Sequence, residues 1–202
     1  TGHRALANLA LDYMYYGDAG AQTTVFGETA FRQRERALED GSARLSSREA
    51  WSMGNVVSGG VVYDSTEFDA RGAVAAAETE TWGARFQLEH MASASWRFGI
   101  GLGIDQGDLT AGRLAADIET VGGDLWAGWR SDTWFFNGVA GVSSTRYDDI
   151  ARLTALTPVV HEGKTRAVTT GARVQAGTWL DMGGLALSPR AALAWVSADV
   201  DG

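Results

Sequence analysis

The chain has 202 residues, with 17 Lys and Arg against 25 Asp and Glu and a formal net charge of −8. An acidic chain lacks the basic face that phosphate binding needs, so we expect no nucleic-acid partner. The chain has no cysteine, which excludes disulfides and thiolate metal sites. No run of about 18 apolar residues predicts a transmembrane helix. Thr1 opens into polar sequence without a signal peptide, so we expect a mature or cut fragment, or a targeting signal upstream.

The first quarter of the chain predicts helices. Residues 3–16 place apolar side chains at helical spacing, which is typical of an amphipathic helix. Residues 17–27 hold three glycines among small polar residues and predict a linker. Residues 28–48 favour a helix by propensity, but they carry many Arg and Glu and few apolar anchors. On composition alone, this last segment predicts a solvated surface helix.

From Ala50 onward the hydrophobic pattern has a period of two, which predicts β-strands. The clearest stretch is SWRFGIGLGID, residues 95–105. Its one face is aromatic and aliphatic, and its other face is mostly glycine with one Arg and one Asp. We predict seven antiparallel strands, at about 50–64, 78–90, 95–105, 117–130, 133–147, 166–180 and 185–200.

The predicted connections alternate in length. Three are tight, at residues 90–93, 130–133 and 181–184. Three are long, at residues 64–77, 105–116 and 147–165. The long connections are predicted to carry many of the acidic residues, namely Asp64, Glu67, Asp69, Asp108, Asp148, Asp149 and Glu162. Short turns alternating with long loops are typical of an up-and-down outer-membrane barrel.

Strand length and the two faces both favour a membrane-spanning sheet. The predicted strands run well beyond the five or six residues common in globular proteins, and about 9–11 residues cross a bilayer. Trp82, Trp96, Trp134 and Trp195 lie on the apolar face, as in an aromatic girdle. The glycine face predicts a water-filled lumen, with candidate lumen-facing residues Arg85, Glu89, Arg97, Asp105, Asp124, Arg173 and Arg190. We therefore expect an all-β fold with N-terminal helices, an antiparallel up-and-down transmembrane β-barrel.

Residues 50–201 resemble the translocator barrel of bacterial autotransporters. The stretches that carry the resemblance are WRFGIGLGIDQGDL, DLWAGWRSDTWFFNGVAGVSSTRYDD and LALSPRAALAWVSADVDG. GHRALANLALDYM, residues 2–14, is similar to the segment directly after the catalytic Asp-x-x-His-Pro block of GDSL (SGNH) esterases. Together they resemble an esterase autotransporter.

The resemblance implies three parts: the helical end of a passenger at 1–20, a linker and lumen helix at 21–48, and the barrel at 49–202. Barrels of this family have 12 strands. We therefore expect about five further strands after Gly202, because seven strands leave two open edges.

The resemblance also changes the interpretation of the charged helical segment. It implies a helix inside the lumen, with plug-helix candidates Arg32, Glu35, Arg36, Glu39 and Asp40. We expect Glu35, Glu39 and Asp40 to pair with lumen arginines, and Arg32, Arg34 or Arg36 to pair with lumen acids. Such wet ion pairs orient a helix more than they stabilise it, at about 0–1 kcal/mol each.

The function implied is an outer-membrane translocator and anchor that carries a passenger to the cell surface. The implied partners are outer-membrane lipid, the chain's own passenger and the barrel-assembly machinery, with no cofactor and no metal. Two alternatives stay open, an OmpA-like structural barrel or simple pore and an enzyme acting at a barrel rim. Residues 1–48 favour the translocator, because a pore needs neither a passenger tail nor a plug helix.

No catalytic residue is predicted in this chain. The catalytic Ser, Asp and His blocks of GDSL esterases do not occur in it, and His3 lies a few residues beyond the family's catalytic histidine. His90 and His161 have no Ser and Asp in register with them, and Ser58 is not in a G-x-S-x-G elbow. Carboxylic ester hydrolysis would belong to the parent protein's passenger.

Overall fold

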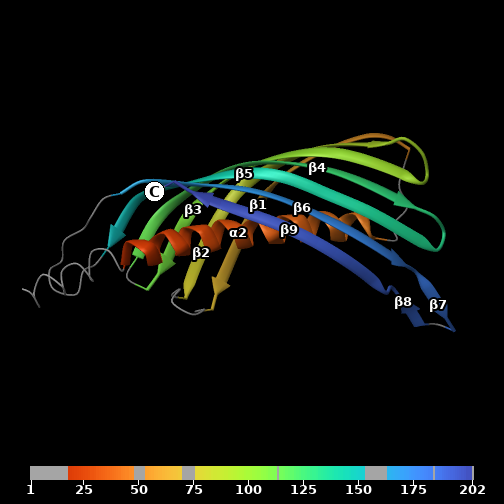
Figure 1. Cartoon of the computed structure of the whole chain (residues 1–202). Coiled ribbons are helices and arrows are strands. Elements are labelled where there is room, and N and C mark those ends of the chain that lie inside the picture. Colours follow the sequence, from red (N-terminus) through yellow and green to blue (C-terminus); the bar gives the residue numbers. More distant parts are fainter. Residues whose placement is uncertain are drawn as a thin grey trace, which may run out of the picture.

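A computed structural model describes residues 18–47, 53–69, 76–112, 114–152, 163–183 and 185–201. One long helix is followed by strands that form a single large sheet and a small hairpin (Figure 1). The elements are α2 (Asp18–Leu45), β1 (Gly54–Phe68), β2 (Ala77–Met91), β3 (Trp96–Ala111), β4 (Leu114–Arg130), β5 (Trp134–Arg152), β6 (Thr165–Thr178), β7 (Leu180–Met182), β8 (Leu185–Leu187) and β9 (Arg190–Val200).

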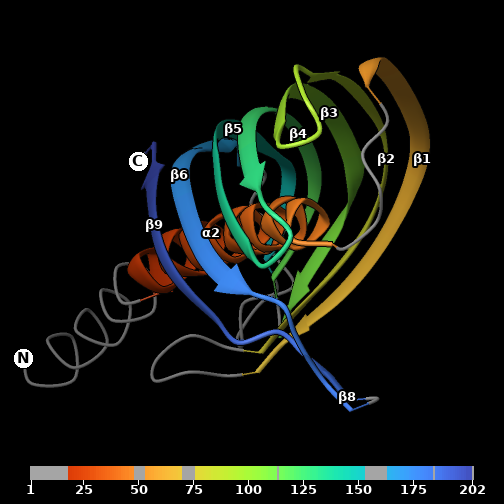
Figure 2. The same cartoon turned by 90° about the vertical axis from the view of Figure 1, so that its right-hand side faces the viewer.

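The main sheet has seven strands in the order β1-β2-β3-β4-β5-β6-β9, and each pair of neighbours is antiparallel. This confirms the predicted up-and-down order and the number of long strands. Within the described residues, β1 and β9 are the two edges of an open sheet. The sheet curves around α2, which lies against its concave face (Figure 2).

The convex face carries the apolar side chains that the period of two predicted. Trp82, Trp96, Trp134 and Trp195 all point away from α2 and are exposed, as is Leu102 at 65%. Several large exposed apolar side chains lie on each of the other strands of the main sheet, and Val174 is the one on β6. A contiguous apolar surface of this kind needs a lipid or protein environment.

Buried side chains gather where α2 meets the sheet, in one cluster toward each end of the strands. We call the end with the short connections 92–95 and 131–133 the turn end, and the opposite end the loop end. The turn-end cluster comprises Leu38, Leu45, Trp126 and Val139, with Val196 packed against it. The loop-end cluster comprises Val25, Phe26, Ala30, Phe68, Ala77, Leu109, Ala111, Leu114, Ala116, Ile118, Tyr147, Ile150 and Ala167, with Val200 packed against it.

The linker predicted at residues 17–27 is wrong for the described residues, because α2 is already helical at Asp18. Gly20 and Gly27 therefore lie inside the helix, and α2 runs across the boundary predicted between residues 20 and 21. Close packing explains the glycine at position 27, since a Cβ there would lie 3.3 Å from Cγ2 of Val200 on β9. Tertiary contact of this kind outweighs the low helix propensity of glycine, about 1 kcal/mol. The helix predicted at residues 3–16 lies outside the described residues.

The long connection predicted at residues 105–116 is also wrong. β3 continues to Ala111, β4 begins at Leu114, and Gly112 turns the chain with a φ of 61°. β1 and β5 likewise extend to Phe68 and Arg152, into the predicted loops 64–77 and 147–165. Consequently several acids assigned to loops lie on strands, namely Asp64, Glu67, Asp108, Asp148 and Asp149, whereas Asp69 directly follows β1. Glu162 lies outside the described residues.

The last two predicted strands are each interrupted at the turn end. β6 stops at Thr178 and β9 starts at Arg190, and between them β7 and β8 form a separate hairpin. Pro189 has no N–H to give to a sheet ladder, which accounts for the break before β9. Its carbonyl still accepts a hydrogen bond from the Thr178 N–H at 3.1 Å.

The glycines of β3 leave space for one large side chain from the next strand. Trp126 on β4 is buried, and its indole lies over Gly99 and Gly101. A Cβ at Gly99 would lie 2.3 Å from Cε2 of the Trp126 ring, closer than real Cβ contacts come. The glycine-rich face of SWRFGIGLGID is thus filled by its neighbour.

We predict that Gly99→Ala destabilises the protein by about 1–3 kcal/mol, because the rigid indole must shift to admit the methyl group. Gly60→Ala is the matched control. Gly60 lies on the same concave face, and no atom lies within 4 Å of its Cβ position. The control is expected to change stability by less than about 0.5 kcal/mol. Thermal unfolding in detergent, followed by circular dichroism, measures both, and equal midpoints for the two variants would contradict this prediction.

Candidate functional site

The concave face of the sheet and the facing side of α2 form the candidate site. All seven predicted lumen-facing residues lie on this face, since directly opposed residues of an antiparallel pair point the same way. Most of them lie opposite glycine in the ladder: Arg85 opposite Gly103, Glu89 opposite Gly99, Arg97 opposite Gly128, Asp105 opposite Gly83, Asp124 opposite Gly141 and Arg190 opposite Gly177. Glycine gives these long side chains room to lie along the sheet.

Two ion pairs join strand to strand within the wall. Arg85 donates to both carboxylate oxygens of Asp105, from Nη1 at 2.7 Å and from Nη2 at 2.8 Å. Arg97 pairs with Glu89, which is 6% exposed. Four of the seven predicted wall residues therefore pair with one another rather than with the helix. The bidentate geometry of the first pair is the strong form of an Arg–carboxylate contact.

Three further ion pairs join α2 to the wall. Arg34, which is 3% exposed, pairs with Asp124 on β4. Arg36 donates to Oδ1 of Asp64 at 2.9 Å and also contacts Thr66 on β1. Nη2 of Arg173 on β6 lies 3.9 Å from Oε1 of Glu39. Helix cations thus meet wall acids at two points, and a helix acid meets a wall arginine at one.

The other predicted helix residues have different surroundings. Arg32 pairs with Glu28 of its own helix at 2.7 Å, and its guanidinium lies 5.5 Å from the centroid of the Phe68 ring. Glu35 and Asp40 are exposed along the cavity beside α2. Among the wall residues, Arg190 is exposed at the start of β9.

A neutral polar cluster holds α2 near the turn end. Ser42 Oγ donates to Oδ1 of Asn137 at 2.8 Å and contacts the Gln175 amide oxygen. Asn137 Nδ2 donates back to the Ser42 carbonyl oxygen at 3.4 Å. All three residues are at most 3% exposed. A buried polar cluster of this kind restricts the rotation and the depth of the helix.

Arg44 forms the last contact before α2 ends. Its guanidinium lies 5.3 Å from the centroid of the Trp126 ring, and it also donates to the Gln87 side chain on β2. Trp126, Ser42, Asn137 and Gln175 were not predicted as site residues. A signal for Trp126 was present, because it is a large residue at a position on the glycine face of β4, beside Gly99 and Gly101 of β3.

A cavity of about 610 Å³ lies between α2 and strands β1 to β4. It exists because α2 packs mainly against β5, β6 and β9, and less against β4. Its walls carry arginines (Arg32, Arg34, Arg36, Arg44 and Arg85) and acids (Glu35, Glu39, Asp40, Asp64, Glu67, Asp105 and Asp124). A space lined by charges of both signs is suited to water.

The described residues show no arrangement for metal binding or nucleophilic catalysis. No group of three or more His, Cys, Asp or Glu in them could hold a metal ion. His90 Nδ1 lies 2.8 Å from Oδ1 of Asn55, an exposed amide contact, and Ser58 lies within strand β1. His3 and His161 lie outside the described residues. Across the described ranges, no helix has the length and apolarity that crossing a membrane requires.

The two-faced, up-and-down sheet around a charged helix defines the class of outer-membrane β-barrel translocators. The family described as autotransporter beta-domain matches residues 57–202, and the chain belongs to this family. Its structure is similar to the translocator domain of the autotransporter NalP from Neisseria meningitidis, with a TM-score of 0.62 and 14% sequence identity. The similarity covers 88% of this chain and 62% of the NalP chain. No curated protein sequence matches the chain. Membership of the family implies the bacterial outer membrane.

We predict that Asp124→Asn destabilises the protein by roughly 2–4 kcal/mol, because it leaves the buried Arg34 guanidinium without its carboxylate. Asp64→Asn breaks the exposed pair with Arg36 and is expected to cost at most about 1 kcal/mol. Thermal unfolding in detergent ranks the two variants.

A double variant separates a lost pair from a lost charge. Arg34→Met with Asp124→Leu removes both charged groups and is expected to be less destabilising than Asp124→Asn alone. A double variant that unfolds at a lower temperature than Asp124→Asn would show that the pair contributes net stability.

Proposed function

We propose that this chain anchors a passenger in the outer membrane and carries it to the cell surface, with α2 held inside the barrel. The observation that carries the proposal is the contact pattern of α2. Its charged and polar side chains meet β1, β2, β4, β5 and β6 at separate points. A structural barrel or a simple pore needs no such helix, so this pattern supports the translocator over those alternatives.

The direction of α2 supports an outward passenger. The helix passes through the loop-end cluster at Val25, Phe26 and Ala30 and ends near the turn end, from which β1 begins. The loop end carries the longer connections 69–76 and 153–164 beside the tight turn at 112–113, whereas 92–95 and 131–133 at the turn end are both short. Outer-membrane barrels have short turns on the periplasmic side. We therefore infer that the loop end faces the cell exterior. Sequence that precedes α2 then lies on the cell surface.

The convex face at the loop end supports the same direction. Glu80, Asp108, Asp117 and Asp148 are directly opposed along four adjacent strands. Such a row of carboxylates cannot lie in hydrocarbon, and like charges placed opposite one another need water between them. The strands thus project beyond the apolar belt at this end.

The working barrel has to pair the edges of β1 and β9. Each unpaired backbone N–H or C=O in hydrocarbon costs several kcal/mol. We infer that further strands of the kind present in 12-stranded family barrels close the sheet. The barrel-assembly machinery would be the partner that inserts it.

The passenger is proposed to be a GDSL-type carboxylic ester hydrolase. Support for this step is the resemblance of residues 2–14 to the segment directly after the catalytic histidine in those esterases. The catalytic Ser, Asp and His would lie in sequence before Thr1. The role proposed for this chain is to display that enzyme on the cell surface.

Expression of the full-length protein in a bacterial outer membrane tests both parts. Intact cells are expected to hydrolyse a water-soluble ester added outside, and external protease is expected to remove that activity. A control that lacks residues 53–202 keeps the passenger but cannot anchor it, so its activity should appear only after lysis. A passenger that external protease cannot reach would refute the translocator function, whereas a protease-sensitive passenger without ester hydrolysis would refute only the esterase assignment.

A further inference from the structure

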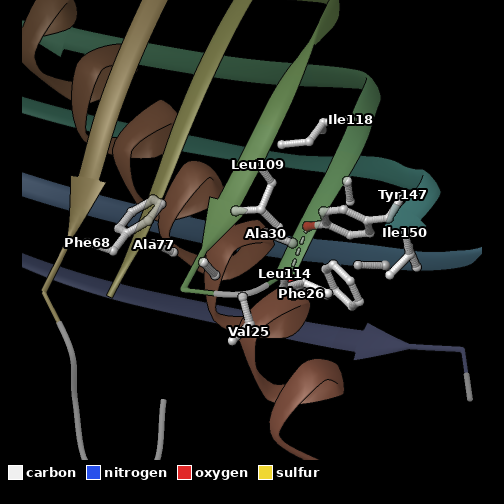
Figure 3. Packing of buried hydrophobic residues seen from close by; sticks show 13 residues of the cluster. Val25, Phe26, Ala30, Phe68, Ala77, Leu109, Leu114, Ile118, Tyr147 and Ile150 are labelled. Atoms are coloured by element: carbon white, nitrogen blue, oxygen red, sulfur yellow. Dashed lines mark hydrogen bonds between the residues drawn. The ribbon is translucent and has the colours of Figure 1, made fainter. Parts of the chain in front are cut away.

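The loop-end cluster differs from the rest of the space around α2, because its members are apolar and the polar side chains buried beside it, Thr29, Thr79 and Thr145, are uncharged. Each of the seven strands of the main sheet contributes at least one side chain to it, from Phe68 on β1 to Val200 on β9. Figure 3 shows Val25, Phe26 and Ala30 of α2 lying among the side chains of these strand ends. Leu109 and Tyr147 are completely buried there.

One contact fixes the helix within this cluster. The Phe26 and Tyr147 rings have centroids 4.4 Å apart, and the Tyr147 hydroxyl donates to the Phe26 carbonyl oxygen at 3.0 Å. Gly27, the next residue, allows α2 to approach Val200 closely. The helix is therefore in tight apolar contact with β5 on one side and with β9 on another.

The charged cavity ends where this cluster begins. Phe68 belongs to both, and Arg32 lies over its ring at the boundary. Below that point the helix and the β1–β4 wall are separated by about 610 Å³ of space lined by ion pairs. Water and ions pass between paired charges, but an apolar constriction excludes them by dewetting.

We propose that the loop-end cluster is the permeability barrier of the translocator, and that the charged cavity is an aqueous vestibule open toward the turn end. The proposal rests on the proposed function, since it requires α2 to lie in the lumen of a closed barrel. It assigns the closure to Phe26 and its neighbours. The ion pairs then orient the helix without closing the passage.

Single-channel conductance of the full-length protein in planar lipid bilayers tests the barrier. Phe26→Ala is expected to raise the conductance in KCl about twofold or more, because removing the ring widens the apolar constriction. Val25→Ser, a smaller change in the same cluster, keeps the test available if Phe26→Ala does not fold. Resistance of the compact form to SDS at room temperature identifies folded variants.

Leu45→Ala is the matched control. It also truncates a buried apolar side chain of α2, but in the turn-end cluster. It is expected to leave the conductance unchanged. Folded loop-end variants with wild-type conductance, or a larger increase for Leu45→Ala, would overturn the proposal. Protease accessibility of the passenger in the same proteins is a separate readout, so failure of the barrier and failure of translocation are distinguishable.

Discussion

The structure depends on how little bulk the concave face of the sheet carries. Arg85, Glu89 and Asp105 each lie opposite a glycine, so their side chains can lie along the sheet instead of standing up from it. A Cβ at Gly103 would lie 2.6 Å from Nη1 of Arg85. With larger residues at these positions, the charged side chains would stand up from the sheet into the cavity beside α2. Glycine on the wall is therefore the condition for a helix beside it.

This arrangement lets the wall neutralise much of its own charge. Arg85 with Asp105 and Arg97 with Glu89 pair between adjacent strands, and the helix makes only a few directed contacts. Partly wet ion pairs contribute little stability, but they distinguish one rotation of the helix from another. The more deeply buried contacts, Arg34 with Asp124 and Ser42 with Asn137, carry the larger penalties if they are broken. The position of α2 is thus specified mainly by a small number of polar groups.

The environment of α2 changes along its length, so the residues that attach the helix to the sheet differ from those that close the passage. At the turn end it is held by an amide cluster and by Arg44 on Trp126. Its middle borders a charged cavity on the β1–β4 side. The segment around Val25, Phe26 and Ala30 is enclosed by apolar strand ends. A helix with few apolar anchors overall can still seal one end, because Phe26 and Val25 lie where the strands supply the complementary surface.

Sequence alone was sufficient for the sheet and for its two faces. The period of two in SWRFGIGLGID and its neighbours is a local property of extended chain, so strand number, antiparallel order and the exposed tryptophans were all predictable. The errors came from using composition as a substitute for structure. Composition assigns Asp108 and Asp148 to loops, although a strand that projects into water tolerates them. It assigns Gly20 and Gly27 to a linker, although a glycine in a helix can serve close packing.

The tertiary structure alone decided which charged groups meet. Arg85 pairs with Asp105 because of the register between β2 and β3. Arg34 reaches Asp124 because α2 packs against β5, β6 and β9 and also contacts β4. Trp126 became a site residue only when β4 placed it over Gly99. The sequence by itself determined that the strands have an apolar and a glycine-rich face, since that information repeats every two residues. Pairing partners, the side on which α2 lies and the apolar closure around Phe26 depend on contacts that no local pattern encodes. The residues that meet are from 8 positions apart, as for Arg97 and Glu89, to more than 100, as for Phe26 and Tyr147.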